Sequence, residues 1–400
     1  MIQLKDICDI YDCPHTTAKD EGKGYPLVRT PNVGKGRLIL NGIHRVSEDV
    51  YNSRNARAIP EEGDLILARE APVGNVSIIM DGQRVCLGQR VVLIKPKRGL
   101  VDPHFLTYYL LSAEVQHRLK NHANGAVVAH LNVSDIRNLW VTLPEFEEQV
   151  AIGKILRSID DKIELNRQIN DNLEQQIQTL YREWFIDNPK TEWATIALSE
   201  VATFVSGYSY KGNELVDSSE TAMATIKNFE RNGGFKLDGY KPVSPSSKLK
   251  EEQHAELFDI LVAHTDLTQN AEVIGNAEII LSKESYRDVI FSMDLVKVVA
   301  KESFPYQFLL ALLLKNPVFK SHCIGYVNGT TVLHMNKRAL PDFNTQIPTC
   351  EDAARMNEIA KSIFTKMSEN LSEIANLTKL RDSLLPKLMS GELKINEIDC

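Results

Sequence analysis

Basic and amide side chains gather in two stretches of this sequence, and these residue types can bind the phosphates and base edges of a nucleic acid. Residues 23–98 hold 13 Lys+Arg against 7 Asp+Glu, and residues 227–250 hold 6 against 2. Taken singly, each of these side chains is better explained as a solvated surface residue than as a base contact. As a clustered set they favour a nucleic-acid ligand. The predicted contact residues are Arg29, Asn32, Lys35, Arg37, Arg45, Arg54, Arg57, Arg69, Lys227, Asn228, Arg231, Asn232, Lys236 and Lys241.

Two other strings could carry catalysis. Asn316-Pro-Val-Phe is similar to the N-P-P-[YF] loop with which amino-methyltransferases hold a flipped adenine. Pro317 at the start of a new helical turn is the simpler interpretation. His130 and His334 each stand in an H-[LM]-N string without a second histidine or an acid at ligand spacing. We interpret these strings as turns that begin a strand, with a catalytic role as the alternative.

Other catalytic and metal-binding motifs are missing from the sequence. It has no G-x-x-x-x-G-K-[ST], G-x-G-x-x-G, H-E-x-x-H or G-x-S-x-G string. Its 6 cysteines are scattered without C-x-x-C spacing, which is typical of reduced thiols in the cytoplasm. Cys8, Cys13 and His15 could form at most a metal half-site. We therefore predict no catalytic residue, metal ion or cofactor in this chain.

The composition is that of a soluble globular protein. The chain has 400 residues, 43% of them hydrophobic, and a formal net charge of -7. Its longest apolar run, residues 308–314, is far shorter than the ~20 residues of a membrane span. The first residues lack the basic stretch and apolar core of a secretory signal. These features predict a cytoplasmic protein with no membrane partner, and the acidic average hides the local basic excess.

An internal repeat organises the chain. The string N-G-A-V-V-A-H-L-N at residues 124–132 returns as N-G-T-T-V-L-H-M-N at residues 328–336, which is 204 positions later. The first part of each copy, residues 1–146 and 191–348, mixes short β-branched runs with Gly, Pro and Asn and has one apolar helix. The second parts, residues 147–190 and 349–400, do not have this mixed pattern. The sequence therefore predicts two α+β heads and two further segments.

These further segments are predicted to be long helices. Apolar residues recur at steps of three and four over about 35 to 39 residues, which corresponds to a helix of roughly 55 Å. Each long helix needs a partner, and the other copy is the natural one, so we expect an antiparallel coiled coil between the two heads. Asn166 and Asn370 lie either buried, where they fix the register, or at the solvent edge. The predicted coiled-coil positions are Ile159, Ile163, Asn166, Leu173, Ile363, Met367, Asn370 and Leu377.

The strings where head meets helix resemble the specificity subunit of type I restriction-modification systems. Residues 131–149, L-N-V-S-D-I-R-N-L-W-V-T-L-P-E-F-E-E-Q, are similar to the conserved region that follows each target-recognition domain in that family. Residues 63–69, G-D-L-I-L-A-R, resemble a strand within such a domain, and residues 380–393 resemble the usual C-terminal ending. The second copy departs at Gln149, whose equivalent is Ala353.

The resemblance implies a non-catalytic DNA reader. Each head would recognise one half of a bipartite asymmetric target in double-stranded DNA, and the helices would set the spacer and dock two modification subunits. S-adenosylmethionine, ATP and Mg would be bound by the modification and restriction subunits, not by this chain. Two alternatives remain: a self-contained adenine-N6 DNA methyltransferase, and a coiled-coil scaffold whose basic patches are incidental.

Overall fold

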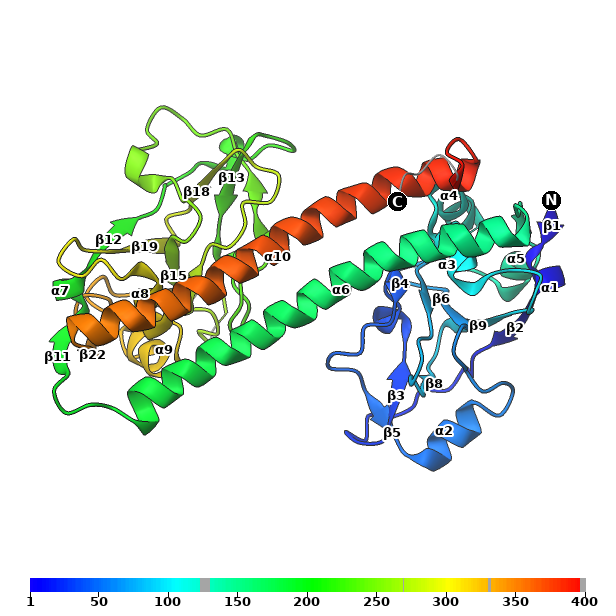
Figure 1. The fold of residues 1–400 in the computed structure, drawn as a ribbon, viewed down its shortest axis with the longest axis horizontal. Helices are drawn as coiled ribbons and strands as arrows, with labels where there is room; N and C mark the ends of the chain where they lie inside the picture. Colours follow the sequence, from blue (N-terminus) through cyan, green and yellow to red (C-terminus); the bar gives the residue numbers. More distant parts are fainter. Residues whose placement is uncertain (123–129, 269, 330–331, 396–400) are drawn as a thin grey trace. The chain divides into compact units, whose positions relative to one another are not determined.

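The computed structural model describes residues 1–122, 130–268, 270–329 and 332–395. The chain divides into two compact units, unit 1 (Met1–Lys162 with Leu377–Cys400) and unit 2 (Ile163–Asn376). Each unit contains one head and one part of each of two long helices, α6 (Phe146–Arg182) and α10 (Cys350–Ser390) (Figure 1). The division falls inside the long helices because each helix part packs on its own head. The division into four segments made from the sequence stays a prediction.

The head of unit 1 is built on a five-stranded sheet in the order β2-β9-β6-β7-β4. Its strands are β2 (Cys8–Asp12), β9 (Val91–Pro96), β6 (Leu65–Ala68), β7 (Val76–Ile78) and β4 (Gly36–Arg37). Strand β6 and residues 91–94 of β9 are apolar and buried because both faces of the sheet are covered. Leu65 and Leu67 enter one core with helix α3 (Pro103–Leu111), whereas Ile66 and Ala68 enter a second core on the opposite face.

Smaller elements complete this head. A three-stranded sheet has the order β5-β3-β8, and β1 pairs antiparallel with β10. These strands are β5 (Arg45–Val46), β3 (Tyr25–Val28), β8 (Cys86–Leu87), β1 (Ile2–Gln3) and β10 (Trp140–Val141). The helices are α1 (Leu4–Ile7), α2 (Glu48–Arg54), α3 (Pro103–Leu111), α4 (Ala113–His122) and α5 (Val133–Arg137), with a 3-10 turn at Thr30–Asn32.

The head of unit 2 repeats the order of the first four strands of the five-stranded sheet and that of the three-stranded sheet. Its main sheet has the order β12-β19-β15-β17, and its second sheet the order β14-β13-β18, in which β13 and β18 are parallel just as β3 and β8 are in unit 1. The strands are β12 (Ala202–Ser206), β19 (Leu295–Ala300), β15 (Ile260–Ala263), β17 (Ala277–Ile279), β14 (Lys241–Pro242), β13 (Thr221–Ala224) and β18 (Asp288–Phe291). The repeat inferred from the sequence is therefore present in the fold.

Further elements frame this second head. Strand β11 (Ala194–Ala197) pairs with β22 (Asn344–Ile347), as β1 pairs with β10. A third small sheet contains β16 (Thr265–Asp266), β21 (Leu333–Met335) and β20 (Val327–Asn328). The helices are α7 (Leu198–Val201), α8 (Gln307–Leu314) and α9 (Pro317–Ile324), with 3-10 turns at Gly212–Glu214, Ile226–Asn228, Leu237–Gly239 and Glu251–Gln253.

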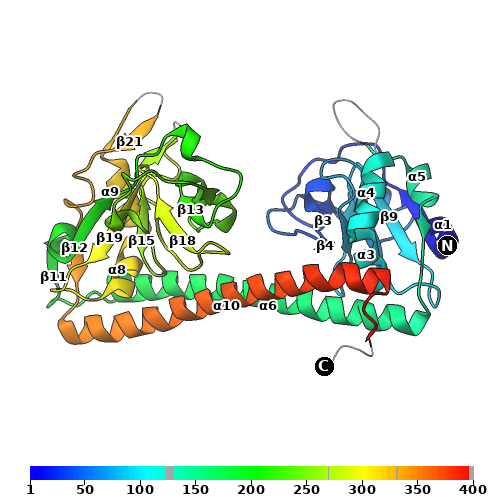
Figure 2. The same cartoon turned by 90° about the horizontal axis from the view of Figure 1, so that it is seen from above.

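Helix α3 or α8 lies between the sheet and the long helices in each unit (Figure 2). Ile152 and Leu156 of α6 share a core with Leu388 of α10 in unit 1, and Phe364 of α10 stacks on Phe308 of α8 in unit 2. Helix α6 ends in a π-helical turn at Glu183–Asp187, shortly before Pro189. Within the described residues no helix is long and apolar enough to cross a membrane.

Candidate nucleic-acid interface

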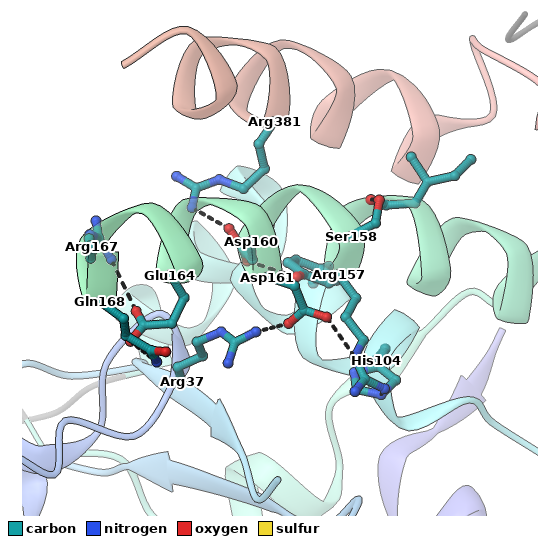
Figure 3. Close-up of polar contacts among 12 residues, drawn as sticks. Arg37, His104, Arg157, Ser158, Asp160, Asp161, Glu164, Arg167, Gln168 and Arg381 are labelled. Carbon is teal, nitrogen blue, oxygen red and sulfur yellow. Dashed lines mark hydrogen bonds and ion pairs between the residues drawn. The ribbon is translucent and has the colours of Figure 1, made fainter. Parts of the chain in front are cut away.

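Two neighbouring carboxylates of α6, Asp160 and Asp161, connect this helix to three other parts of unit 1 (Figure 3). Arg37 at the end of β4 forms an ion pair with Asp161. The Tyr108 hydroxyl of α3 donates to Asp160 Oδ2 over 2.7 Å, and Arg381 of α10 donates to Asp160 Oδ1 over 2.9 Å. One turn of α6 therefore holds the head, α3 and α10 together.

Partial burial sets the protonation of this cluster. Burial raises the pKa of Tyr108 well above its ordinary value, and the charge of Asp160 raises it further, so the hydroxyl stays a donor. Burial alone would lower the pKa of Arg381, but its hydrogen bonds to Asp382 and Asp160 raise it. Because the Asp160 side chain is only 10% exposed, removing either donor would leave a poorly solvated carboxylate with fewer partners.

His104 extends the cluster on the side of Asp161. Arg157 Nη1 lies 2.8 Å from His104 Nε2, and Arg157 Nε lies 3.3 Å from Asp161 Oδ2. Burial lowers the pKa of His104, and the positive charge of Arg157 lowers it further. The imidazole is therefore neutral at neutral pH, and its Nε2 accepts the hydrogen bond from Arg157.

A buried lysine makes the corresponding connection in unit 2. Lys315, directly after α8, lies 3.2 Å from Glu174 of α6 and forms a second ion pair with Glu278 of β17. Burial alone would lower the pKa of Lys315, but the two carboxylates raise it well above its ordinary value. Glu278 is 3% exposed, and its Oε1 accepts a hydrogen bond from the Gly234 amide over 2.6 Å. Contacts therefore lead from Glu174 of α6 through Lys315 and Glu278 to the surface loop that contains Gly234.

The helix that faces the long helices is capped differently in the two units. In unit 1, Asp102 accepts a hydrogen bond over 2.8 Å from an amide in the first turn of α3. A Cβ on Gly153 of α6 would lie 2.6 Å from Asp102 Oδ1, so glycine is required there. In unit 2, Tyr306 replaces the aspartate, and Asn357 of α10, 204 positions after Gly153, accepts from two α8 amides at 3.1 and 3.2 Å. The cap comes from the head in one unit and from the long helix in the other.

The repeated asparagines of the long helices are buried between α6 and α10 in unit 2. Asn166 and Asn370 are each 1% exposed. Asn166 Nδ2 donates to Glu373 Oε2 and Asn370 Nδ2 to Asn170 Oδ1, both over 2.8 Å. Asn166 and Asn370 are therefore buried and do not lie at the solvent edge, which was the other arrangement considered for them. A slip in register would leave buried amides without partners, so these residues fix the register.

The other predicted coiled-coil positions are apolar and face the interior. Those that are buried are Ile159, Ile163, Ile363 and Met367, and those that are half-buried are Leu173 and Leu377. The two helices run antiparallel in each unit. In unit 1 Asp160 meets Arg381, and in unit 2 Asn170 donates to the Met367 carbonyl over 3.1 Å.

Asn32 and Asn228, both predicted to contact nucleic acid, instead organise the backbone of the heads. Each accepts a hydrogen bond from the amide three residues earlier, at 3.1 and 2.9 Å. Each also donates to a carbonyl seven or eight residues later, at 3.3 and 2.8 Å. Both side chains are buried. We correct their role, because an amide whose oxygen and nitrogen are both engaged internally does not present its edge to a base.

Three predicted arginines of unit 1 also have internal partners. Arg54 is 8% exposed and donates to the Leu87 carbonyl over 2.7 Å. Arg69 is 7% exposed and donates to Asp12 Oδ1 over 2.8 Å. Arg37 forms an ion pair with Asp161 of α6. The guanidinium groups of Arg54 and Arg69 stabilise the head, which corrects their assignment as direct contact residues. Arg37 is half-buried, and its contact with nucleic acid stays a prediction.

The remaining predicted contact residues lie nearer the surface. The exposed ones are Lys35, Arg45 and Arg57 in unit 1 and Lys227, Arg231, Asn232 and Lys236 in unit 2, whereas Arg29 and Lys241 are half-buried. Arg231 Nε lies 3.1 Å from Glu272 at the surface, a pair that competes weakly with a phosphate. Their contact with nucleic acid stays a prediction.

No metal-binding group is formed by the described residues, since they hold no cluster of three or more His, Cys, Asp or Glu side chains suited to an ion.

Unit 2 has a cavity of about 1010 Å³ bordered by α6, α10 and residues 231–235. Its walls combine apolar side chains such as Phe364 and Met367 with the Lys315 ion pairs. In both units the described residues position a surface loop of the head against a long helix.

Residues 1–175 match the family model described as the type I restriction modification DNA specificity domain. The chain is 24% identical to the MjaIX specificity subunit of Methanocaldococcus jannaschii, covering 99% of this chain and 94% of that protein. It is 25% identical to the HindI specificity subunit of Haemophilus influenzae, covering 84% and 88%. The chain is thus similar to specificity subunits of type I restriction-modification systems. The S subunit crystal structure from M. genitalium has the same fold, with a TM-score of 0.62 at 16% identity and coverage of 97% and 95%.

The string that resembles a methyltransferase loop begins a helix. Asn316 caps α9 by accepting hydrogen bonds from the amides of Val318 and Phe319 at 2.8 and 3.0 Å. Its Nδ2 donates to the Leu313 carbonyl, and the side chain is 8% exposed. The interpretation of Pro317 as the start of a helical turn is confirmed, and Asn316 is not placed to hold an adenine.

The repeated histidines contact different groups in the two heads. His130 Nδ1 lies 3.1 Å from Glu70, and its Nε2 lies 2.7 Å from Arg69. His334 lies within β21, where its Nδ1 is 3.3 Å from Thr265 Oγ1. A strand at His334 agrees with the prediction, whereas residues 124–129 before His130 lie outside the described residues. Both histidines support local structure.

Sequence reasoning missed the residues that join head to helix. Asp160 and Asp161 form an acidic pair directly after the buried Ile159, and Lys315 is a charge directly after a seven-residue apolar run. A charge beside an apolar stripe that must be buried is a usable signal, because it requires a partner. The identity of that partner was not readable from the sequence.

Proposed function

We propose that this chain is a specificity subunit that reads a bipartite, asymmetric target in double-stranded DNA, with one half-site for each head, and that it performs no chemistry itself. The observation that carries this proposal is the repetition of one sheet topology in two heads whose exposed polar residues differ. One scaffold used twice provides two similar modes of docking. Different side chains on it provide two different half-site sequences.

The charge distribution supports a DNA ligand that is shared with other subunits. The chain has a formal net charge of -7, and the two stretches with an excess of basic residues, 23–98 and 227–250, lie in the heads. DNA affinity depends on how many phosphates are neutralised. The isolated chain therefore holds DNA weakly, and the modification subunits supply much of the neutralisation.

The long helices are suited to setting the spacer between the half-sites. Helix α6 has 37 residues and rises roughly 55 Å, and half-sites on one face of a duplex repeat about every 34 Å. The helices also offer docking surfaces for two modification subunits. Those subunits would bind S-adenosylmethionine, and restriction subunits would use ATP and Mg, all in the cytoplasm where the DNA is.

Binding to cognate and random duplexes tests the proposal. The full chain is assembled with its modification subunits, and methylated adenines in the host genome identify the cognate motif. We expect a split motif and an affinity for it at least a thousandfold above that for random duplex at physiological salt. Equal affinity for both would refute the proposal.

Neutralising exposed charges separates DNA reading from a scaffold role. Arg37 is unsuitable for this test because it pairs with Asp161, so the variant combines Lys35→Ala, Lys227→Ala and Lys236→Ala. A DNA reader should lose affinity and show a shallower salt dependence. A scaffold with incidental basic patches would keep the same affinity.

A further inference from the structure

Each head carries one short hairpin loop that is closed at its base by a buried asparagine. Residues 34–37 form the first loop, between the bridged residues Val33 and Leu38. Residues 230–234 form the second, between the bridged residues Phe229 and Phe235. The closing asparagines, Asn32 and Asn228, make the same pair of backbone contacts. The two loops are therefore equivalent in the repeat.

The first loop is held by two side chains from the region of β7. Asn75 Nδ2 donates to the Val33 carbonyl over 3.0 Å. Ser77 Oγ lies 3.1 and 2.8 Å from the carbonyl oxygens of Gly34 and Arg37, the two ends of the loop. Ser77 is fully buried. The backbone at this loop is thus held by hydrogen bonds to three carbonyl oxygens, those of residues 33, 34 and 37.

The second loop is held by the equivalent positions of β17. Asn276 and Glu278 lie 201 positions after Asn75 and Ser77. Asn276 Nδ2 donates to the carbonyl of residue 230 over 2.7 Å, and Glu278 Oε1 accepts from the amide of residue 234 over 2.6 Å. Lys315 pairs with the other oxygen of Glu278 and links it to α6. The same two positions therefore clamp the loop in both heads with different chemistry.

The clamped loops present different polar side chains to the surface. The first exposes Lys35 between two glycines, and the second exposes Arg231 and Asn232. Gly36, at φ +89°, and Gly234, at φ +118°, adopt left-handed conformations that favour glycine. A loop whose backbone is already fixed loses little conformational entropy when it binds. Buried polar groups devoted to holding a surface loop are expected where the exact position of its side chains matters.

We propose that residues 34–37 and 230–234 are sequence-reading loops of the two heads, and that Asn75, Ser77, Asn276 and Glu278 are their positioning residues. Lys35 has the chemistry to contact the O6 and N7 of a guanine in one half-site, and Asn232 the N6 and N7 of an adenine in the other. This inference rests on the proposed DNA-reading function and names the side chains that perform it.

Selection from a random duplex pool tests the reading residues. The full chain, assembled with its modification subunits, is used as wild type, Lys35→Ala and Asn232→Ala. Lys19→Ala and Arg287→Ala are the matched controls, since each truncates an exposed basic residue of the same unit outside the loop. We expect Asn232→Ala to lose about tenfold preference for adenine at one position of one half-site, with the other half-site and the spacer unchanged. Lys35→Ala should act on guanine in the other half-site.

Three outcomes would overturn the assignment of these residues. The loop variants could leave both half-sites unchanged, they could weaken binding equally for all sequences as a phosphate contact would, or the controls could relax the same positions. A wild-type complex that selects no split motif would instead refute the proposed function. The two failures are therefore distinguishable.

Two double variants test the positioning role of Glu278. Glu278→Gln with Lys315→Gln and Glu278→Leu with Lys315→Leu both remove the buried ion pair. Only the glutamine variant keeps an acceptor for the amide of residue 234. We expect it to retain the half-site preference, and the leucine variant to relax it about tenfold at equal thermal stability. Equal preference in both would overturn the positioning role.

The hydroxyl of Ser77 provides an independent test in unit 1. Ser77→Ala removes one small group from the first clamp and should relax only the half-site that Lys35→Ala affects. This test remains decisive if the leucine double variant does not fold. Unchanged selectivity in folded Ser77→Ala would contradict the clamp.

Discussion

Replacing Lys315 by methionine should destabilise unit 2 severely. Lys315 is shared by Glu174 at 3.2 Å and by Glu278, which is 3% exposed. Unit charges about 3 Å apart attract by about 5 kcal/mol at an effective dielectric constant of about 20. Desolvation offsets part of that, and removing one partner of a buried pair costs about 3–5 kcal/mol because the other charge is left unpaired.

The size of unit 2 converts this cost into a shift of the melting temperature. Residues 163 to 376 number 214, and in a domain of this size 1 kcal/mol corresponds to about 2–4 °C. The expected decrease is therefore about 6–20 °C. Because the pKa of Lys315 is raised above its ordinary 10.5, its stabilisation is fully present below that value and is lost only as pH rises beyond it. The measurement belongs at pH 7.

Thermal and urea unfolding of the full chain would measure the effect. Lys211→Met makes the same substitution at an exposed site and should stay within about 0.5 kcal/mol of wild type. Lys315→Met combined with Glu278→Leu should recover most of the loss, since an apolar pair of similar volume replaces the buried charges. A loss below about 1 kcal/mol for Lys315→Met, or no recovery in the double variant, would refute the reasoning.

The long helices, the α9 cap and one acidic residue give three further predictions. One heptad inserted near Asn166 and another near Asn370 preserve the apolar stripe and add about 10 Å. Methylation mapping should therefore find a spacer longer by at most about three base pairs and unchanged half-sites. A new half-site with the old spacer would argue against the role of the long helices in setting the spacer. Asn316→Ala should lower unfolding free energy by about 1 kcal/mol through loss of the cap while the assembled complex still methylates DNA, and lost methylation at unchanged stability would contradict this. The hydrogen bond from Lys190 lowers the pKa of Asp352 to about 2, so stability from that carboxylate is present above its unfolded value and is lost as pH falls. The deficit of Asp352→Asn should therefore shrink between pH 4 and pH 2 in acid unfolding, and a deficit independent of pH would exclude the carboxylate as its source.

Much of the architecture was predictable because it rests on local patterns. Steps of three and four apolar residues define α6 and α10, and the string repeated 204 positions apart relates the two heads. The identity of Asn316 as a helix cap was also readable, since Asn before Pro at the start of a helix satisfies local amides. The helices and the cap depend on residues within a few positions of one another, and the repeat is visible when the sequence is compared with itself.

The assignment of individual contact residues was less successful. Arg54, Arg69, Asn32 and Asn228 carry the residue types that bind nucleic acid, yet all four are buried with internal partners. Arg69, for example, is neutralised by Asp12, which lies 57 positions earlier. Composition detects an excess of basic residues but does not distinguish a side chain that supports the head from one that faces solvent.

The sequence by itself determined the repeat, the α+β heads, the two long helices and the resemblance to specificity subunits of type I restriction-modification systems. Only the tertiary structure decided which polar side chains are free to meet DNA and which hold the fold. The physical reason is range: helical periodicity and capping are set by near neighbours, whereas burial and ion pairing join residues far apart in the chain. The clamped loops illustrate this, since Ser77 and Glu278 reveal their role only where β7 and β17 pass beneath residues 34–37 and 230–234.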